Sequence, residues 1–136
     1  MPANATAQSV AEKLARDFLE RVWGPEHEVA VIDELMTPDY VIHTGGKTVR
    51  GREAFKAWVV EFHQLMPDAV DEILDVFANT AGDRVCARWI NRGKNNGVFG
   101  LMPDGKPIAF HGVSIWKVRD GRLAECWVER AAPRPS

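Results

Sequence analysis

Residues 110–130 read FHGVSIWKVRDGRLAECWVER, and this stretch decides the fold. Apolar and polar residues alternate on both sides of its central Arg-Asp-Gly-Arg, which predicts two antiparallel strands joined by a tight turn. Successive side chains of a strand point to opposite faces, so Glu125, Trp127 and Glu129 share one face of the second strand. That face either lies in water or lines a pocket.

Two turns are compatible with the centre of this hairpin. A two-residue type I′ turn over residues 120–121 would pair Arg119 with Arg122. A three-residue turn over residues 119–121, with its glycine in a left-handed bulge position, would pair Val118 with Arg122. A one-residue slip moves every side chain to the other face of the sheet, so the turn decides which residues of the two strands face the same way.

The two turns place the only histidine of the hairpin differently. With the two-residue turn, His111 lies on the face opposite Glu125 and Glu129. With the three-residue turn, His111 shares their face and lies across from Glu129. The other face of the second strand carries small apolar residues, Ala124, Cys126 and Val128. Those residues suit a core row, which would leave the glutamates in water, so the pattern leaves the buried face open.

The rest of the chain predicts helices first and strands afterwards. Helical periodicity marks residues 9–23, 26–36 and 52–66. Strand patterns mark residues 39–44, 70–79 and 84–92, before the 110–130 hairpin. Ser9 and Glu12 have the spacing of a capping box for the first helix, and the tail from residue 131 is expected to fray. This order predicts one α+β domain over residues 1–136, with its core at about 8–131, in which three helices pack on a curved, mostly antiparallel sheet and enclose a cavity.

Composition narrows the class of protein. The chain has 136 residues, of which 46% are hydrophobic and 26% charged, as in a globular domain. The net charge is −2 and the pI is near 6.1, so no basic field exists for a nucleic-acid backbone. No run of about 18 apolar residues occurs, so we expect no membrane span.

The compartment is expected to be the cytoplasm. The start, MPANATAQSV, lacks the basic and long apolar regions of a secretion signal. Cys86 and Cys126 lie 40 residues apart without a CxxC partner, so we interpret them as reduced and buried in a cytosolic protein. No metal-binding spacing and no nucleotide-binding glycine motif is present, so neither a metal nor a cofactor is expected.

Three longer stretches resemble a known family. They are VWG…VIDELMTPDYVIH, GREAFKAWVVEFHQLMPD and GDRVCARWINRGKNNGVFGLMPDGKPIAFHGVSIWKVRDGRLAECW. Together they are similar to the SnoaL-like polyketide cyclases, also called ester cyclases, over roughly residues 10–130. The resemblance implies the nuclear transport factor 2-like fold, a cone-shaped barrel that is usually a homodimer through its sheet.

The resemblance also implies an activity. Characterised members close a ring of a polyketide ester by an intramolecular aldol reaction, without metal or cofactor, and use a histidine and an acidic residue in the pocket. His111 and Glu125 match those positions best. This favours the three-residue turn, with the histidine and a glutamate facing the cavity.

Related families imply further site residues. Limonene epoxide hydrolases carry an acid two residues after a tryptophan, which matches Glu129 after Trp127, and an arginine on the middle strand, which Arg88 resembles. Ketosteroid isomerases place their base where His43 falls. We therefore expect Glu125 or Glu129 to act as base, the hairpin histidine as acid, and His43 to orient the substrate.

The expected pocket is apolar. Its predicted walls are Trp127, Trp116, Phe99 and Phe110, with Arg88 as a polar contact. Such walls raise the pKa of a carboxyl group toward neutrality, where it can transfer protons. The sequence thus predicts a cofactor-independent enzyme for a small, apolar carbonyl compound. Two alternatives stay open, an epoxide hydrolase or isomerase in the same pocket, and a non-catalytic ligand-binding dimer.

Overall fold

The structure is a computed structural model that describes residues 6–136. Residues 1–5, the beginning of the segment MPANATAQSV in which no secretion signal is expected, lie outside the described residues. The helical elements are α1 (Ala7–Asp17), η1 (Phe18–Val22), η2 (Val29–Val31), α2 (Ile32–Leu35), α3 (Arg52–Leu65) and η3 (Val98–Gly100). The strands are β1 (Met36–Thr44), β2 (Lys47–Arg50), β3 (Val70–Ala78), β4 (Arg84–Lys94), β5 (Pro107–Arg119), β6 (Arg122–Arg130) and β7 (Arg134–Pro135).

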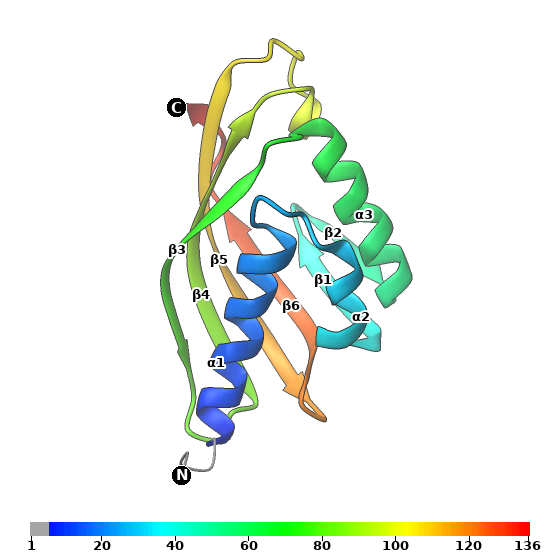
Figure 1. Ribbon diagram of the computed structural model, residues 1–136, viewed down its shortest axis with the longest axis vertical. Coiled ribbons are helices and arrows are strands. Elements are labelled where there is room, and N and C mark those ends of the chain that lie inside the picture. The colour runs from blue at the N-terminus through cyan, green and yellow to red at the C-terminus, as the bar shows by residue number, and fades with distance from the viewer. Residues whose placement is uncertain (1–5) are drawn as a thin grey trace.

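The strands form one mixed sheet in the order β2-β1-β6-β5-β4-β3, with β7 paired to β5. Every pair is antiparallel except β1 with β6. Figure 1 shows α1, α2 and α3 on one side of this twisted sheet. The predicted α+β architecture, three helices on a mostly antiparallel sheet, is confirmed. None of the helices within residues 6–136 has the length and hydrophobicity needed to cross a bilayer.

The first helix starts earlier than predicted. The cap is Thr6, whose Oγ1 accepts a hydrogen bond from the Ser9 N–H at 3.0 Å, so the expected cap at Ser9 is wrong. The Thr6 hydroxyl thus satisfies the Ser9 N–H, an exposed backbone donor at the start of the helix. Glu12 reaches β3 instead, where its carboxylate accepts from the Ala78 N–H at 3.3 Å.

Two other boundaries differ. The predicted helix 26–36 shrinks to the short turns η2 and α2, because Met36 already belongs to β1. Pro38 is tolerated in this strand because β2 pairs with it only from residue 41 onward, so the missing N–H breaks no bond on that side. The tail does not fray as expected, since β7 pairs with β5 and the Ser136 N–H donates to the Pro107 carbonyl oxygen at 3.0 Å.

The hairpin uses the two-residue turn, so the favoured three-residue turn is wrong. Asp120 and Gly121 both have positive φ, 54° and 72°, and Arg119 pairs with Arg122. Below the turn Val118 still opposes Leu123, but Lys117 opposes Glu125, so Ala124 is an extra residue in a β-bulge.

The bulge restores the pairing of faces that the three-residue turn predicted. Ile115 pairs with Trp127 and Val113 with Glu129, so these side chains and His111 do share one face. His111 itself lies across from Ala131, whose N–H donates to its carbonyl oxygen at 2.9 Å, rather than from Glu129.

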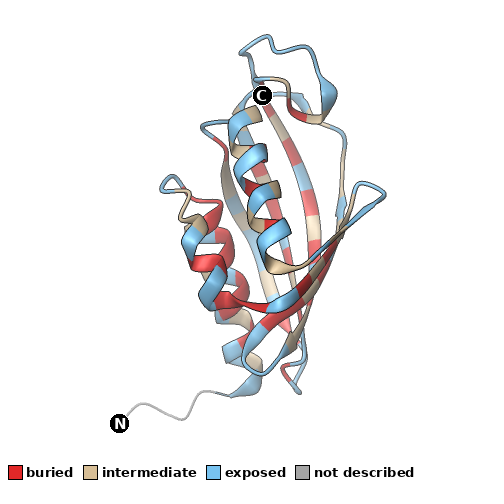
Figure 2. Ribbon diagram, turned by 90° about the vertical axis from the view of Figure 1, so that its right-hand side faces the viewer, coloured by how far each residue is buried: buried red, intermediate tan, exposed pale blue. Residues whose placement is uncertain are grey.

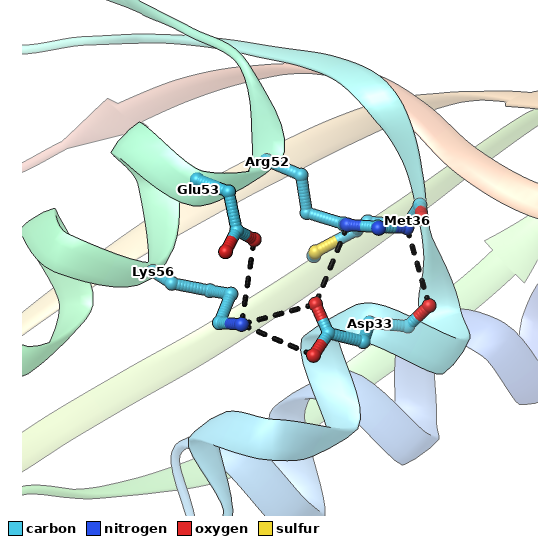
Figure 3. Close-up of polar contacts among 5 residues, drawn as sticks. All are labelled: Asp33, Met36, Arg52, Glu53 and Lys56. Atoms are coloured by element: carbon cyan, nitrogen blue, oxygen red, sulfur yellow. Dashed lines mark hydrogen bonds and ion pairs between the residues drawn. The ribbon is translucent and has the colours of Figure 1, made fainter.

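An ion-pair cluster anchors α3 to the end of α2 (Figure 3). The Asp33 carboxylate lies 3.0 Å from the Lys56 ammonium and 3.4 Å from Nε of Arg52. Arg52 also donates to the Met36 carbonyl oxygen at 3.1 Å, and Glu53 approaches Lys56 within 3.3 Å. These contacts fix the start of α3 beside β1 and so direct the apolar stripe of α3 toward the sheet.

Candidate active site

A cavity lies between the helices and the inner face of the sheet. Its cavity volume is about 70 Å³, within a wider hollow of about 570 Å³ that includes open solvent. Its walls are mostly aromatic: Phe18, Trp23, Tyr40, Phe55, Trp58, Phe62, Trp89, Phe99, Phe110 and Trp116. We call this the aromatic cavity. The predicted wall residues Trp116, Phe99 and Phe110 are among these lining residues.

One carboxyl group enters the aromatic cavity. Asp71 of β3 and Asn91 of β4 are paired neighbours, and the Asn91 amide donates to Asp71 Oδ1 at 2.6 Å. Asp71 as a whole residue is half-buried, but its side chain lies among the cavity walls. That burial raises the pKa of Asp71 from 3.8 to about 8, although the Asn91 hydrogen bond partly opposes the rise. Asp71 therefore exchanges a proton within the ordinary working range of an enzyme.

The Asn91 side chain can accept a further hydrogen bond. Its amide oxygen is buried and accepts no hydrogen bond from residues 6–136. A buried amide oxygen without a donor costs free energy, and a ligand N–H or O–H can recover it. Asn91 is thus suited both to hold Asp71 and to contact a ligand.

Further polar groups line the cavity on β1, β4 and β5. Trp89 Nε1 donates to Ser114 Oγ at 2.9 Å. The Tyr40 hydroxyl and Trp116 Nε1–H are buried next to each other, with the Cys126 thiol beside Tyr40, and neither makes a hydrogen bond of good geometry within residues 6–136. Burial raises the pKa of Tyr40, so its hydroxyl stays protonated. Both groups can therefore donate to an oxygen atom of a ligand.

A glycine makes room for one wall of the cavity. A Cβ atom at Gly112 would lie 2.7 Å from two atoms of the Trp89 ring. Only glycine therefore lets this indole lie over β5 with its N–H directed at Ser114. The ring in turn packs edge-on against Phe110, with centroids 5.7 Å apart.

The predicted acid–base residues lie elsewhere, on what we call the outer face, the side of the sheet turned away from the helices. The inward row of β5 and β6 includes Phe110, Ser114, Trp116 and Cys126, all buried. The alternate residues His111, Glu125 and Glu129 therefore face outward. Their expected place in the cavity is wrong, because the core row of small apolar residues packs under the helices. Figure 2 shows buried and exposed residues alternating along these strands.

Two expected binding residues also lie on the outer face. Trp127 is 38% exposed and Arg88 is exposed on β4, where the inward row is instead 85, 87, 89 and 91. Neither lines the aromatic cavity.

His43 and Glu125 do meet, but outside the cavity. His43 Nε2 lies 2.7 Å from Glu125 Oε2, and Nδ1 lies 3.0 Å from Thr48 Oγ1. The Trp127 ring stacks on the imidazole with centroids 5.7 Å apart. The structure thus joins two predicted site residues that come from neighbouring parallel strands.

Sequence reasoning missed the carboxyl group inside the cavity. The signal was present in residues 84–92, where Asn91 is the polar member of an otherwise apolar alternating row. The antiparallel pairing of β3 with β4 then places Asp71 directly opposite Asn91.

The fold and the site together define a small α+β protein with an enclosed aromatic pocket. The family model for the SnoaL-like domain matches residues 15–126, so the chain belongs to the SnoaL-like domain family. No curated protein matches the chain significantly.

Solved structures share the fold. A candidate SnoaL-like polyketide cyclase from Jannaschia sp. CCS1 is 19% identical, with 96% of this chain and 91% of that chain covered and a TM-score of 0.81. IdmH, a candidate polyketide cyclase from Streptomyces antibioticus, is 24% identical, with coverage of 88% and 91% and a TM-score of 0.72. A candidate polyketide cyclase from Bacillus cereus ATCC 10987 is 26% identical, with coverage of 90% and 74% and a TM-score of 0.70.

Proposed function

We propose that this protein is a cofactor-independent enzyme of the polyketide-cyclase type. It binds a small aromatic or polycyclic carbonyl compound in the aromatic cavity and closes a ring by an aldol reaction. The observation that carries this proposal is Asp71, a carboxyl group within an aromatic enclosure whose pKa is raised to about 8. The structural relatives described as candidate polyketide cyclases support the same class.

The chemistry needs one proton acceptor that becomes a proton donor. A base removes a proton beside one carbonyl, the enolate carbon bonds to a second carbonyl carbon, and the new alkoxide takes a proton. Ionised Asp71 would accept the first proton and return it to the alkoxide, so no other reactant is consumed. A pKa of about 8 keeps both forms of Asp71 populated in the pH range where the two transfers must alternate.

The buried donors have a role in the same reaction. Negative charge moves from the substrate carbon to a carbonyl oxygen when the enolate forms. The buried Tyr40 O–H and Trp116 N–H would stabilise that oxygen, since donors fixed in an apolar cavity need no reorganisation. Asn91 would keep the Asp71 carboxyl oriented toward the cavity.

This assignment replaces the predicted acid and base. His111, Glu125 and Glu129 lie outside the cavity, and so does the Arg88 that an epoxide-opening mechanism would use. The proposal therefore keeps the predicted reaction and changes the residue that performs it.

Asp71→Asn tests the proposal directly. We expect this variant to lower kcat/KM for a turned-over β-keto ester by about 10²–10⁴-fold, because it removes the acid–base group and keeps the shape. Asp75→Asn is the matched control, because Asp75 is exposed on the same strand. Turnover would be followed by chromatography across a panel of linear and cyclic β-keto esters.

The outcomes separate the functions. Full activity in Asp71→Asn would exclude Asp71 as the base. Saturable binding of panel compounds without turnover at any pH from 6 to 9 would instead favour the non-catalytic ligand-binding module.

We also propose that the protein forms a homodimer through the outer face. Large apolar side chains lie exposed there, with Phe77 at 53%, Ile115 at 43% and Trp127 at 38%. Exposed apolar groups clustered on one face are typical of a contact surface. Such a dimer would cover the His43–Glu125 pair and leave the aromatic cavity of each subunit on the helical side.

A further inference from the structure

Arg130 stands where three hollows of the surface meet. It is the last residue of β6, lies on the inner face and is half-buried. It lines the aromatic cavity, a groove along the β1–β2 turn at residues 43–48, and a groove between that turn and the loop at 98–100. Arg130 is therefore shared by the aromatic cavity and both grooves.

The guanidinium of Arg130 has no anionic partner. No carboxylate of residues 6–136 lies within 4.0 Å of the guanidinium, and the guanidinium donates no hydrogen bond to any of these residues. By contrast, Arg21, Arg92 and Arg119 each pair with a carboxylate. A half-buried cation without a counter-ion is an unfavourable arrangement, because burial removes water that would solvate it.

The surroundings orient this cation rather than neutralise it. The Arg130 Cζ atom lies 3.9 Å from the centroid of the Phe99 ring, a cation–π contact that fixes the guanidinium plane at the cavity mouth. Glu61 and Glu129 border the adjoining grooves, but neither contacts the guanidinium. The N–H groups of Arg130 thus remain available to a ligand.

The position of Arg130 relative to Asp71 sets the shape of a ligand that reaches both residues. Asp71 lies on β3 and Arg130 on β6, so three strand spacings, about 14 Å between backbones, separate them across the sheet. Both residues line the aromatic cavity, from the two outer strands of the four in the order β6-β5-β4-β3. The rings of Trp89 and Phe110 lie on the strands between them.

We propose that Arg130 is a carboxylate-binding subsite, and that the substrate is an aromatic or polycyclic acid whose carboxylate lies at the end remote from the reacting carbon. A planar guanidinium binds a carboxylate through two parallel N–H···O bonds, which fixes direction as well as affinity. The substrate would then enter with its rings against the aromatic walls and its reacting end at Asp71. This substrate class rests on the proposed function, whereas the subsite itself does not.

Matched ligands test the subsite by isothermal titration calorimetry. The probes are 2-naphthoate and the uncharged 2-naphthamide, which have the same ring system. We expect Arg130→Gln to weaken 2-naphthoate binding by about tenfold or more and to change 2-naphthamide binding less than about twofold. Arg130→Lys should recover part of the loss, because it keeps the charge without the planar fork.

The control is Arg50→Gln, an exposed arginine on β2 that lines none of these hollows. It should bind both probes like the original protein. An equal loss of both probes in Arg130→Gln, unchanged naphthoate affinity, or no binding of naphthoate by the original protein would each overturn the subsite.

Asp71→Asn separates this proposal from the proposed function. It should bind 2-naphthoate with unchanged affinity even though it loses turnover. If Arg130 proves essential for naphthoate binding and Asp71→Asn keeps full activity, the carboxylate subsite stands and the acid–base assignment falls.

Discussion

Asp71 owes its chemistry to its neighbours rather than to its own strand. β3 is an edge strand of the sheet, and Ala78 is its only fully buried residue. The rings that enclose Asp71 come from the helices and from β4 and β5. An aspartate in water titrates near 3.8, and this enclosure raises its pKa to about 8. A residue that an isolated strand would leave ionised is thereby poised for proton transfer.

The same shift predicts a pH dependence of stability at the residue scale. Between pH 3.8 and about 8 the folded protein holds a proton on Asp71 that the unfolded chain has released. The free energy of unfolding contributed by Asp71 therefore falls as pH rises through this window. Asp71→Asn cannot ionise, so we expect its Tm to exceed that of the original protein at pH 9 and the gap to close toward pH 4.

Thermal unfolding followed by circular dichroism from pH 4 to 9 measures this difference. Asp75→Asn should follow the original protein across the whole range, because that carboxylate is exposed. Parallel curves for Asp71→Asn and the original protein would mean that the carboxyl is not desolvated in the fold.

At the scale of elements, the β5–β6 hairpin decides which residues reach the cavity. Its turn alone would place His111 and Glu125 on opposite faces, and the extra residue Ala124 reverses that outcome. The pair then shares a face, yet the face is the outer one, because Phe110, Trp116 and Cys126 pack under the helices. The register of the hairpin therefore decides which residues share a face, and the packing of the helices decides which face is buried.

The turn itself gives a prediction for this element. Gly121 occupies the second position of the type I′ turn with φ of 72°. We expect Gly121→Ala to lower the free energy of unfolding by about 1 kcal/mol, because alanine resists positive φ. Urea unfolding measures the change. Asp120→Gly is the companion variant, and it should be no less stable, since φ at that position is 54°. A neutral Gly121→Ala would show that another turn forms in solution.

At the scale of the whole molecule, the two faces of the sheet have different tasks. The inner face with the helices encloses the aromatic cavity, and the outer face presents exposed apolar and charged side chains. Since β4, β5 and β6 each contribute alternate residues to both sides, one set of strands builds both the pocket and the proposed dimer surface.

The dimer prediction belongs to this scale. Ile115→Lys places a charge in the centre of the proposed contact, so we expect it to shift the protein to a monomer in size-exclusion chromatography with light scattering. Val60→Lys is the control, because Val60 on α3 is equally exposed, 43%, but lies on the helical side. If the unsubstituted protein is itself a monomer, the proposed dimer surface is wrong.

Local patterns of the sequence were enough for the element order. The period of residues 52–66 and the alternation of 84–92 and 110–130 depend on neighbours in the chain, so the helix α3 and the strands β4 to β6 were predictable. Three of the aromatic residues predicted as pocket walls, Trp116, Phe99 and Phe110, line the aromatic cavity. The caps and ends failed where an equivalent residue nearby competed, as Thr6 did with Ser9.

Tertiary structure alone decided the site. The chain by itself determined an α+β domain with two-faced strands, because backbone alternation and helical period are local properties. Which face became the interior depended on the bulge at Ala124 and on the helices that cover one side, and both act through contacts between distant segments. The raised pKa of Asp71 and the unpaired position of Arg130 arise in the same way, since desolvation depends on every element that surrounds a group.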